Sequence, residues 1–306
     1  MPQHHLLSQD PAHRLFSARR ASTRGAVLAG ALALVVGSLA ACGASDPGAD
    51  PLGPTAKAGQ SSPAGERAAL VDLYRATDGP GWTDHTGWDE TDDFCTWYGV
   101  TCEDGHVTEL DLHSNELSGS VPDSIGDLTG LTYLGLFDNQ LDAVPQTIGN
   151  LTNLTVLFLH ENQLTSVPET IGNLTRLTRL ELGENQLTSV PETVGNLTDL
   201  DILYLEYNQL ASVPESIGNL TSLTELNLSN NQHIASVPES IGNLTSLTYM
   251  ALSGNRITAL PESITNLDSL TSLYLASDTC FTPSAKVAAW LDGIDKVDGW
   301  DGHTVC

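Results

Sequence analysis

The sequence predicts an α/β solenoid, in which similar short units stack side by side and share one core. Three observations predict this fold class. One segment type recurs eight times between residues 107 and 280, leucines within it stand two residues apart, and segments rich in cysteine and tryptophan flank the array. A unit this short cannot enclose its own apolar side chains, so only stacking against its neighbours buries them.

Each unit combines a strand pattern with a turn pattern. In the unit around Leu180, this residue and Leu182 stand two apart, so both point to the same side of a strand. Upstream, Pro168 presets φ for a short helical turn, and Ile171 and Leu174 face one way from it. We therefore expect eight short parallel strands. The units begin, at spacings of 23 residues except 24 after the first and the sixth, at Val107, Leu131, Leu154, Leu177, Leu200, Leu223, Leu247 and Leu270.

The recurring pattern LxxLxLxxNxL resembles the leucine-rich repeat family, and the text between the strands, such as VPETIGNLTRL, is similar to its plant and Ras-suppressor types. This resemblance implies a horseshoe with the strands on its concave face. It also implies that the buried asparagine of each of the first seven repeats bonds to free backbone groups of the neighbouring turn; the eighth repeat has Asp278 at this position. An amide buried without such partners would be costly.

The two ends of a solenoid need covers. Before the repeats, FCTWYGVTC closely resembles the N-terminal cap of plant extracellular leucine-rich repeat proteins, and after them a shorter helical cap is expected. Cys95 and Cys102 lie on one side of the array, and Cys280 and Cys306 lie on the other. Because an even number of cysteines in an exported protein favours disulfides, we expect local pairing within each end.

The N-terminus has the pattern of an export signal. A basic stretch precedes the apolar run AVLAGALALVVGSLAA, which is too short for a good membrane span. The letters LAAC resemble the lipobox of bacterial lipoproteins, which implies a lipid on Cys42 and attachment to a bacterial cell membrane or outer membrane. An ordinary secretory signal with a chance cysteine is the alternative.

These patterns divide the chain into five segments. The predicted segments are a signal peptide with lipobox (1–41), a disordered Gly/Ala/Pro tether (42–65), an N-terminal cap (66–106), the leucine-rich repeats (107–280) and a C-terminal cap (281–306).

Charge limits the kinds of partner. The chain has 38 acidic residues against 12 lysines and arginines, for a net charge of -26. Because such a surface repels phosphate backbones, nucleic acid is excluded as a partner. The oligomeric state is not set by any pattern in the sequence.

Variation among the repeats is concentrated at the positions between the strand leucines. The text VPE[ST]IGNLT returns almost unchanged, whereas every Phe and Tyr of the array stands at a concave position. Exposed aromatic residues beside charged groups are typical of recognition surfaces. The predicted ligand-binding residues are Tyr133, Phe137, Val156, Phe158, His160, Arg179, Glu181, Ile202, Tyr204, Glu206, Tyr207, Tyr249 and Tyr274.

The sequence thus predicts a non-catalytic module that binds a protein or peptide ligand at the bacterial cell envelope. No phosphate loop, nucleophile elbow or HExxH motif occurs, and neither a cofactor nor a metal is predicted. Two alternatives stay open. Aromatic side chains also stabilise neighbouring strands, so the chain could be a structural or adhesive spacer without a specific ligand. The aspartates of the C-terminal segment recur every third residue, so whether this segment binds calcium stays open.

Overall fold

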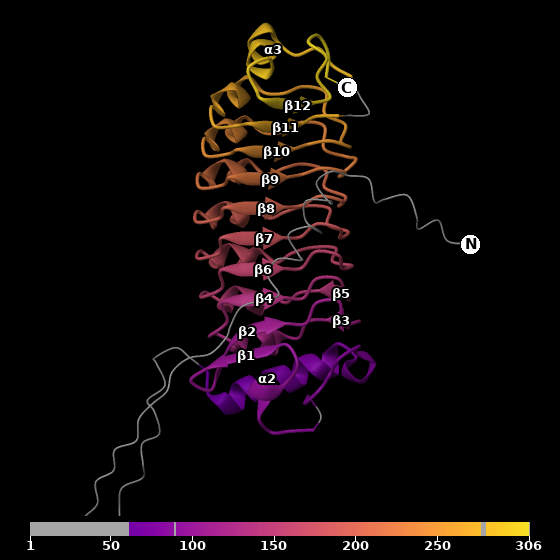
Figure 1. Ribbon diagram of the computed structural model, residues 1–306, viewed down its shortest axis with the longest axis vertical. Helices are drawn as coiled ribbons and strands as arrows, with labels where there is room; N and C mark the ends of the chain where they lie inside the picture. Colours follow the sequence, from indigo (N-terminus) through magenta and orange to yellow (C-terminus); the bar gives the residue numbers. More distant parts are fainter. Residues whose placement is uncertain (1–60, 89, 277–279, 306) are drawn as a thin grey trace, which may run out of the picture. The chain divides into compact units, whose positions relative to one another are not determined.

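A computed structural model describes residues 61–88, 90–276 and 280–305, which form a stack of repeats with a cap at each end (Figure 1). One ten-stranded sheet runs through the stack. In spatial order its strands are β1 (Val100–Glu103), β2 (His106–Asp111), β4 (Tyr133–Gly135), β6 (Val156–Phe158), β7 (Arg179–Glu181), β8 (Ile202–Tyr204), β9 (Glu225–Asn227), β10 (Tyr249–Ala251), β11 (Ser272–Tyr274) and β12 (Lys296–Asp298).

The predicted solenoid with eight parallel repeat strands is confirmed. Strands β2, β4 and β6 to β11 pair in parallel and in matching register, so that Arg179 lies opposite Ile202 and Glu181 opposite Tyr204. The caps extend the sheet, because β1 pairs antiparallel with β2 and β12 pairs parallel with β11.

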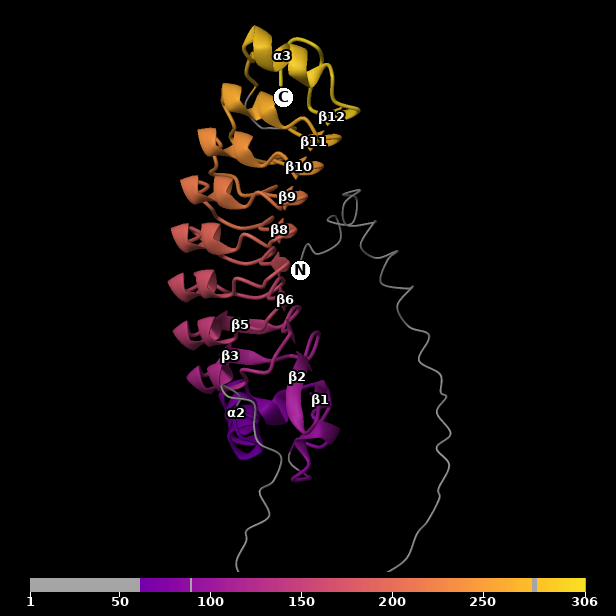
Figure 2. The same cartoon turned by 90° about the vertical axis from the view of Figure 1, so that its left-hand side faces the viewer.

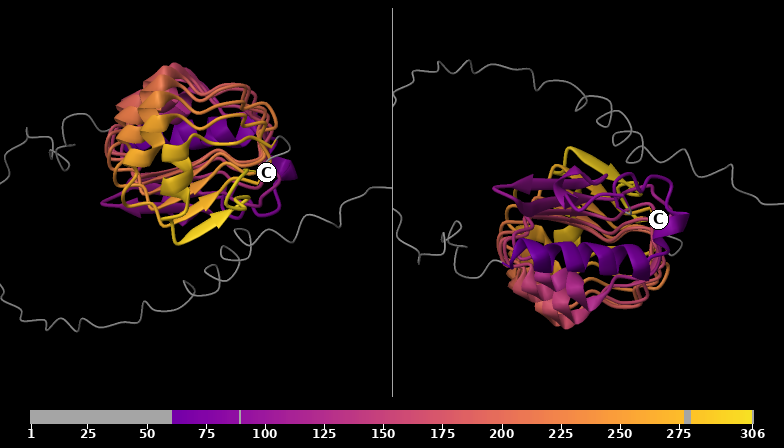
Figure 3. Two further views of the ribbon diagram at one scale, coloured as in Figure 1. Left: turned by 90° about the horizontal axis from the view of Figure 1, so that it is seen from above. Right: turned by 90° about the horizontal axis from the view of Figure 1, so that it is seen from below.

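Short 3₁₀ helices occupy the side of the stack opposite the strands (Figure 2). Each follows the repeat proline; Pro168, for example, is the N-cap of the helix Glu169–Asn173. Figure 3 shows these helices superimposed when the stack is viewed along its axis. They are η3 (Asp123–Asp127), η4 (Gln146–Asn150), η5 (Glu169–Asn173), η6 (Glu192–Asn196), η7 (Glu215–Asn219), η8 (Glu239–Asn243) and η9 (Glu262–Asn266).

A feature that the repeat pattern did not predict is a second, two-stranded parallel sheet of β3 (Ser118–Ser120) and β5 (Gln140–Ala143). It joins the first two repeats. The first repeat is one of the two with 24 residues, and in both an additional left-handed residue follows the repeat asparagine. These residues are Glu116, at φ 61°, and Gln232, at φ 60°.

The core is a continuous column of leucine, isoleucine and valine side chains between the strands and the 3₁₀ helices. In the fourth repeat, Leu177, Leu180, Leu182 and Leu187 are all fully buried. The predicted bonding of the repeat asparagine is also present. Asn185 donates to carbonyl oxygens of Leu159, Leu182 and Gly183 at 2.9 to 3.1 Å and accepts from the Leu164 amide at 2.9 Å, which ties adjacent turns together.

The N-terminal cap covers the first repeat with α2 (Pro63–Ala76) and two 3₁₀ turns, η1 (Gly79–Gly81) and η2 (Phe94–Thr96). Helix α2 begins inside the segment predicted as a disordered tether, because Ser62 caps it and Pro63 stands in its first turn. Four rings pack at centroid distances of 4.9 to 6.0 Å and seal the end of the core; they belong to Tyr74, Trp82, Trp88 and Trp97.

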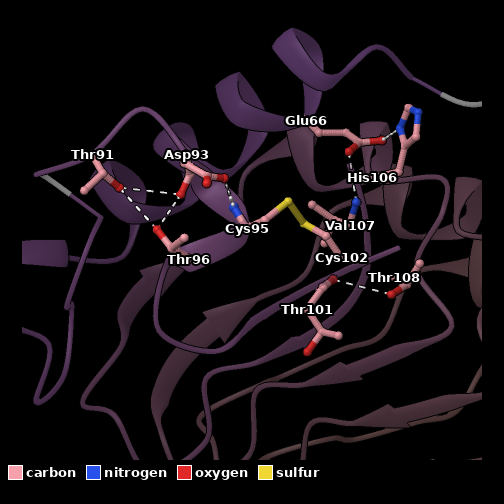
Figure 4. The surroundings of a disulfide bond; sticks show 10 residues. All are labelled: Glu66, Thr91, Asp93, Cys95, Thr96, Thr101, Cys102, His106, Val107 and Thr108. Atoms are coloured by element: carbon pink, nitrogen blue, oxygen red, sulfur yellow. Dashed lines mark hydrogen bonds and ion pairs between the residues drawn. A yellow bond between two sulfur atoms is a disulfide. The ribbon is translucent and has the colours of Figure 1, made fainter. Parts of the chain in front are cut away.

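The predicted disulfide between Cys95 and Cys102 is present beside the start of α2 (Figure 4). Cys280 is also disulfide-bonded, whereas its predicted partner Cys306 lies outside the described residues. The same holds for Cys42 and for the whole predicted signal peptide.

The C-terminal cap consists of α3 (Ala285–Leu291) and β12. Its buried side chains are Val287, Leu291 and Val305, while Trp290 and Trp300 are only half-buried against the core. Aliphatic side chains therefore close this end, in contrast to the tryptophan-rich N-terminal cap.

Candidate functional site

The candidate site is the concave face, which we define as the outward positions of the repeat strands together with the two residues that follow each strand leucine pair. On β7 these positions are Arg179 and Glu181, which flank the fully buried Leu180. The register continues beyond the strands, because the amide of Glu161 donates to the carbonyl of Gly183 and that of Glu184 to Glu206. Concave residues of adjacent repeats therefore stand side by side in rows.

An aromatic ridge crosses the first three repeats on this face; it consists of His113, Tyr133, Phe137, Phe158 and His160. Phe137 is stacked between the two imidazoles, with ring centroids 4.6 Å from His113 and 4.5 Å from His160 and interplanar angles of 3° and 14°. Phe158 meets Tyr133, Phe137 and His160 edge to face at 5.7 to 6.0 Å. These are favourable aromatic geometries, so the five rings hold one another in place.

An ion pair in the fourth repeat borders the ridge. Arg179 Nε donates to Glu181 Oε1 at 2.6 Å, and the guanidinium carbon lies 5.2 Å from the centre of the Phe158 ring. His160 Nδ1 lies 3.2 Å from the other oxygen of Glu181. Four of the predicted ligand-binding residues thus form one contact network: Phe158, His160, Arg179 and Glu181.

Other predicted residues lie elsewhere on the face or deeper in it. The hydroxyl of Tyr204 donates to Glu225 on the adjacent strand β9, on the side away from the ridge. Tyr249 and Tyr274 form a separate pair at 5.5 Å, and Lys296 of the C-terminal cap lies 4.4 Å from the centre of the Tyr274 ring. Val156, Ile202, Glu206 and Tyr207 are half-buried concave residues between these groups.

The expectation of exposed side chains is wrong at two positions. Tyr204 is 8% exposed and Glu181 is 5% exposed, since neighbouring repeats cover them. The alternation of side chains along a strand predicts the face on which a residue lies. How far that residue is buried depends on the size of the side chains beside it in the neighbouring repeats.

Sequence reasoning did not select His113 and Asp111, which complete the N-terminal end of the ridge. His113 Nδ1 lies 2.7 Å from Asp111 Oδ1, and its ring covers Phe137. Aligning the repeats by column would have found this contact, because His113, Phe137 and His160 occupy the same column in three successive repeats.

Two tyrosines of the face have perturbed acidity. Burial is the main cause that raises the pKa of Tyr204 far above its usual value, and its hydrogen bond to Glu225 and the charge of that carboxylate add to the effect. Burial also raises the pKa of Tyr133, followed by the negative charges of Asp111, Glu109 and Glu181.

We expect Tyr133 and Tyr204 to stay protonated at a pH where unfolded tyrosine ionises. A pKa raised in the folded state means that their contribution to stability is present below about pH 10 and is lost as the pH rises above that value. Phenolate absorbance measured against pH, in folded and in urea-unfolded protein, tests this. In Tyr204→Phe the late part of the titration should shrink, and loss of an early-ionising phenol instead would contradict the assignment.

Within residues 61–88, 90–276 and 280–305, no group of three or more His, Cys, Asp or Glu side chains is placed to hold a metal ion. No helix in this described part is both long and apolar enough to cross a membrane. What the concave face offers is packed rings and charged groups, which suit binding.

Sequence comparisons identify the repeats. A family model described as "Leucine-rich repeat region" matches residues 106–231, and one described as "Leucine Rich Repeat" matches 222–244 and 246–267. The "Leucine rich repeat N-terminal domain" matches 63–103, the segment of α2 and the disulfide. The chain is a leucine-rich repeat protein. Its N-terminal domain is of the plant type.

Curated relatives include several plant proteins. A rice protein named receptor protein kinase WSS1 is 42% identical over 89 residues, which are 28% of this chain and 9% of the relative. Leucine-rich repeat protein 1 of Arabidopsis thaliana is 41% identical over 76 residues, which are 24% of this chain and 34% of the relative. This leucine-rich repeat chain thus matches only about a tenth to a third of these relatives' lengths.

Solved structures show the same architecture. The complex of PEPR1 with AtPEP1 matches with a TM-score of 0.64 and 34% identity, over 71% of this chain and 32% of that one. The ectodomain of the Arabidopsis receptor kinase HAESA, in complex with an extended IDA peptide hormone, matches with a TM-score of 0.61 and 27% identity, over 78% and 42%.

The predicted location at a bacterial membrane is contradicted by these comparisons. The N-terminal domain matches the plant-type family model, and the curated relatives include receptor proteins of rice and Arabidopsis. The HAESA ectodomain likewise belongs to a plant receptor kinase, so these relatives and this structural neighbour are plant receptor proteins and not bacterial lipoproteins. The lipobox resemblance rested on four letters outside the described residues, whereas the cap and the repeats match over long segments.

Proposed function

We propose that this protein is a non-catalytic recognition module that binds a peptide, or an extended segment of a protein, along its concave face. The observation that carries the proposal is the aromatic ridge. Its five rings stand at positions that the repeat framework leaves free, and each is only half-buried. Aromatic side chains that are held rigidly and remain partly exposed contribute much of the binding energy of protein interfaces at low entropic cost.

The structural comparisons support a peptide ligand. The PEPR1 structure is a complex with AtPEP1, and the HAESA ectodomain structure holds a peptide hormone. This chain spans less than half of either receptor chain, so the proposal concerns the recognition step alone.

A structural role without a specific ligand is the second candidate. Tyr204 favours it, because this concave aromatic residue is buried and bonded across the sheet to Glu225. Tyr98 of the N-terminal cap, which is 36% exposed, is the one exposed large apolar residue in the described part of the chain. The two candidates differ in whether loss of ridge rings abolishes binding or only lowers stability.

A peptide selection distinguishes them. Random dodecapeptides displayed on phage are selected on the immobilised protein, and the dissociation constants of enriched peptides are measured for the wild type, Phe137→Ala and Phe158→Ala. We expect each variant to weaken binding about tenfold or more, as for aromatic residues at the centre of an interface. Thermal unfolding of each variant shows whether the fold is retained.

The matched control is Tyr98→Ala, which removes an aromatic ring from the cap and should leave the affinity unchanged. Peptides that bind Phe137→Ala and Phe158→Ala as tightly as the wild type would contradict the proposal. In that case, a large loss of thermal stability in the two ridge variants would support the structural role.

A further inference from the structure

From the charges around the aromatic ridge we infer that the ligand is a basic peptide, with arginine side chains on both sides of an apolar centre. This inference rests on the proposed function and specifies the chemistry of its ligand. Its three elements are two carboxylates at opposite borders of the ridge, the charge balance of the face, and the spacing between the two carboxylates.

The first carboxylate is that of Asp111, at the N-terminal border of the ridge. A Cβ built on Gly135 of the next strand would lie 2.7 Å from Asp111 Oδ1 and 2.7 Å from the Tyr133 hydroxyl. The glycine therefore leaves room for the carboxylate to fold over the neighbouring strand. There it lies beside Tyr133, whose pKa it raises.

The second carboxylate is that of Glu206, at the opposite border. A Cβ built on Gly183 would lie 2.7 Å from Glu206 Oε1 and 2.8 Å from its Cδ. Gly183 occupies the column of His113, Phe137 and His160, so the row of rings ends where this carboxylate begins. Both borders of the ridge thus have the same construction, a glycine covered by the carboxylate of an adjacent repeat.

The charge of the concave face is strongly one-sided. In the described repeats, Arg179 is the one lysine or arginine at a concave position, and it pairs with Glu181. The carboxylates at concave positions of repeats one to six are Glu109, Asp111, Asp138, Glu161, Glu181, Glu184, Glu206 and Glu225. A cationic ligand is therefore favoured both in its approach and in its bound state.

Spacing and chemistry favour arginine. The strands that carry Asp111 and lead to Glu206 lie four apart, about 19 Å at the usual strand separation, but each carboxylate folds one strand inward, over Gly135 or Gly183, so the two carboxylates lie about 10 Å apart across the strands. An extended peptide of about six residues crosses these four strands. The long side chains of its terminal arginines then reach about one strand inward to the carboxylates, and the apolar side chains between them meet the rings. A guanidinium group both pairs with carboxylates in a fixed geometry and stacks on aromatic faces, whereas an ammonium group does not stack as a plane.

Synthetic heptapeptides test the inference. The probe has arginine at both ends and alternating glycine and leucine between them. Three comparison peptides carry citrulline in place of arginine, lysine in place of arginine, or both arginines at one end. Affinity is measured by fluorescence anisotropy at physiological ionic strength. We expect the probe to bind about tenfold more tightly than the citrulline peptide and several-fold more tightly than the other two.

Protein variants locate the contacts. Asp111→Asn and Glu206→Gln should each weaken the probe about five- to tenfold, because the amide oxygen still accepts a hydrogen bond from arginine but the negative charge is lost. Glu215→Gln removes an exposed carboxylate from η7 on the opposite side of the stack and should have no effect. Equal weakening by Glu215→Gln, or equal binding of the citrulline or one-ended peptide, would overturn the inference.

The outcomes separate this inference from the proposed function. If the selected dodecapeptides depend on Phe137 and Phe158 but carry no basic residues, the charge inference is wrong and the recognition face remains. If the arginine probe depends on Asp111 and Glu206 while Phe137→Ala and Phe158→Ala bind it normally, the two carboxylates bind without the ridge.

Discussion

Glu66→Ala is expected to detach the N-terminal cap from the first repeat, at a cost of about 3–5 kcal/mol in the free energy of unfolding. The Glu66 side chain is fully buried. Its Oε2 accepts from the Val107 amide at 3.0 Å, and its Oε1 lies 2.9 Å from His106 Nδ1 and accepts from Ser61 at 3.2 Å (Figure 4). One carboxylate therefore joins helix α2 to the first repeat strand.

The large effect follows from what remains after the substitution. Without the carboxylate, the Val107 amide is buried and has lost its acceptor, and a cavity separates the helix from β2. Urea unfolding followed by tryptophan fluorescence reports on this cap, because Trp82, Trp88 and Trp97 pack within it. The cap transition should move to lower urea concentration.

Two variants make the test specific. Glu66→Gln retains an oxygen acceptor for the Val107 amide and should lose much less stability. Asp72→Ala removes an exposed acid of the same helix, whose pair with Arg75 at 4.0 Å is largely in solvent, so its effect should be below about 1 kcal/mol. If Glu66→Ala and Asp72→Ala unfold at the same urea concentration, the carboxylate does not hold the cap.

Much of the fold could be predicted from the sequence, because residues with the same structural role recur at the same position in each repeat. The strand pair Leu180 and Leu182, the proline that starts each 3₁₀ helix and the bonding of Asn185 all recur in a fixed frame, and the structure confirms them. The position of Cys95 and Cys102 on the same side of the repeats also predicted their disulfide, which is present.

Features formed by unique residues could not be predicted in this way. Glu66 has no counterpart in the repeats that could indicate its role. The helical spacing of the apolar residues in α2 does not show that one of its acidic residues is buried against β2. The packing of the concave face depends on which side chains meet across adjacent rows. Gly135 and Gly183 look like gaps in the pattern, yet each makes room for a carboxylate of another repeat. Tyr204 is buried for a similar reason, since Glu225 lies beside it.

Asn185→Ala is expected to be strongly destabilising, as is the same change at the equivalent Asn162 and Asn208, with a loss of about 3–5 kcal/mol. The amide of Asn185 bonds to three carbonyl oxygens and to the Leu164 amide, all within the buried turn between the third and fourth repeats. Alanine leaves the Leu164 amide and the Leu159 carbonyl without these partners, and water cannot easily replace them in a buried position.

Because Asn185 lies between the third and fourth repeats, Asn185→Ala should also change how cooperatively the array unfolds. Because each repeat contacts only its neighbours, a weak interface between the third and fourth repeats uncouples the two parts of the stack. Urea unfolding by circular dichroism should therefore become broader as well as shift. Gln186→Ala, at the exposed neighbouring position, is the matched control and should leave the transition unchanged.

Asn185→Asp tests the hydrogen-bond account through pH. An aspartate retains the acceptor for the Leu164 amide, but its charged form points oxygen at the carbonyls that Asn185 Nδ2 now contacts. Burial and these carbonyls would raise the pKa of the new carboxyl above its unfolded value. The stability of Asn185→Asp should thus be greatest below that unfolded value and fall as the pH rises, since only the protonated carboxyl can donate. A variant whose stability relative to the wild type does not change between pH 4 and pH 7 would show that the amide donors contribute little to the turn.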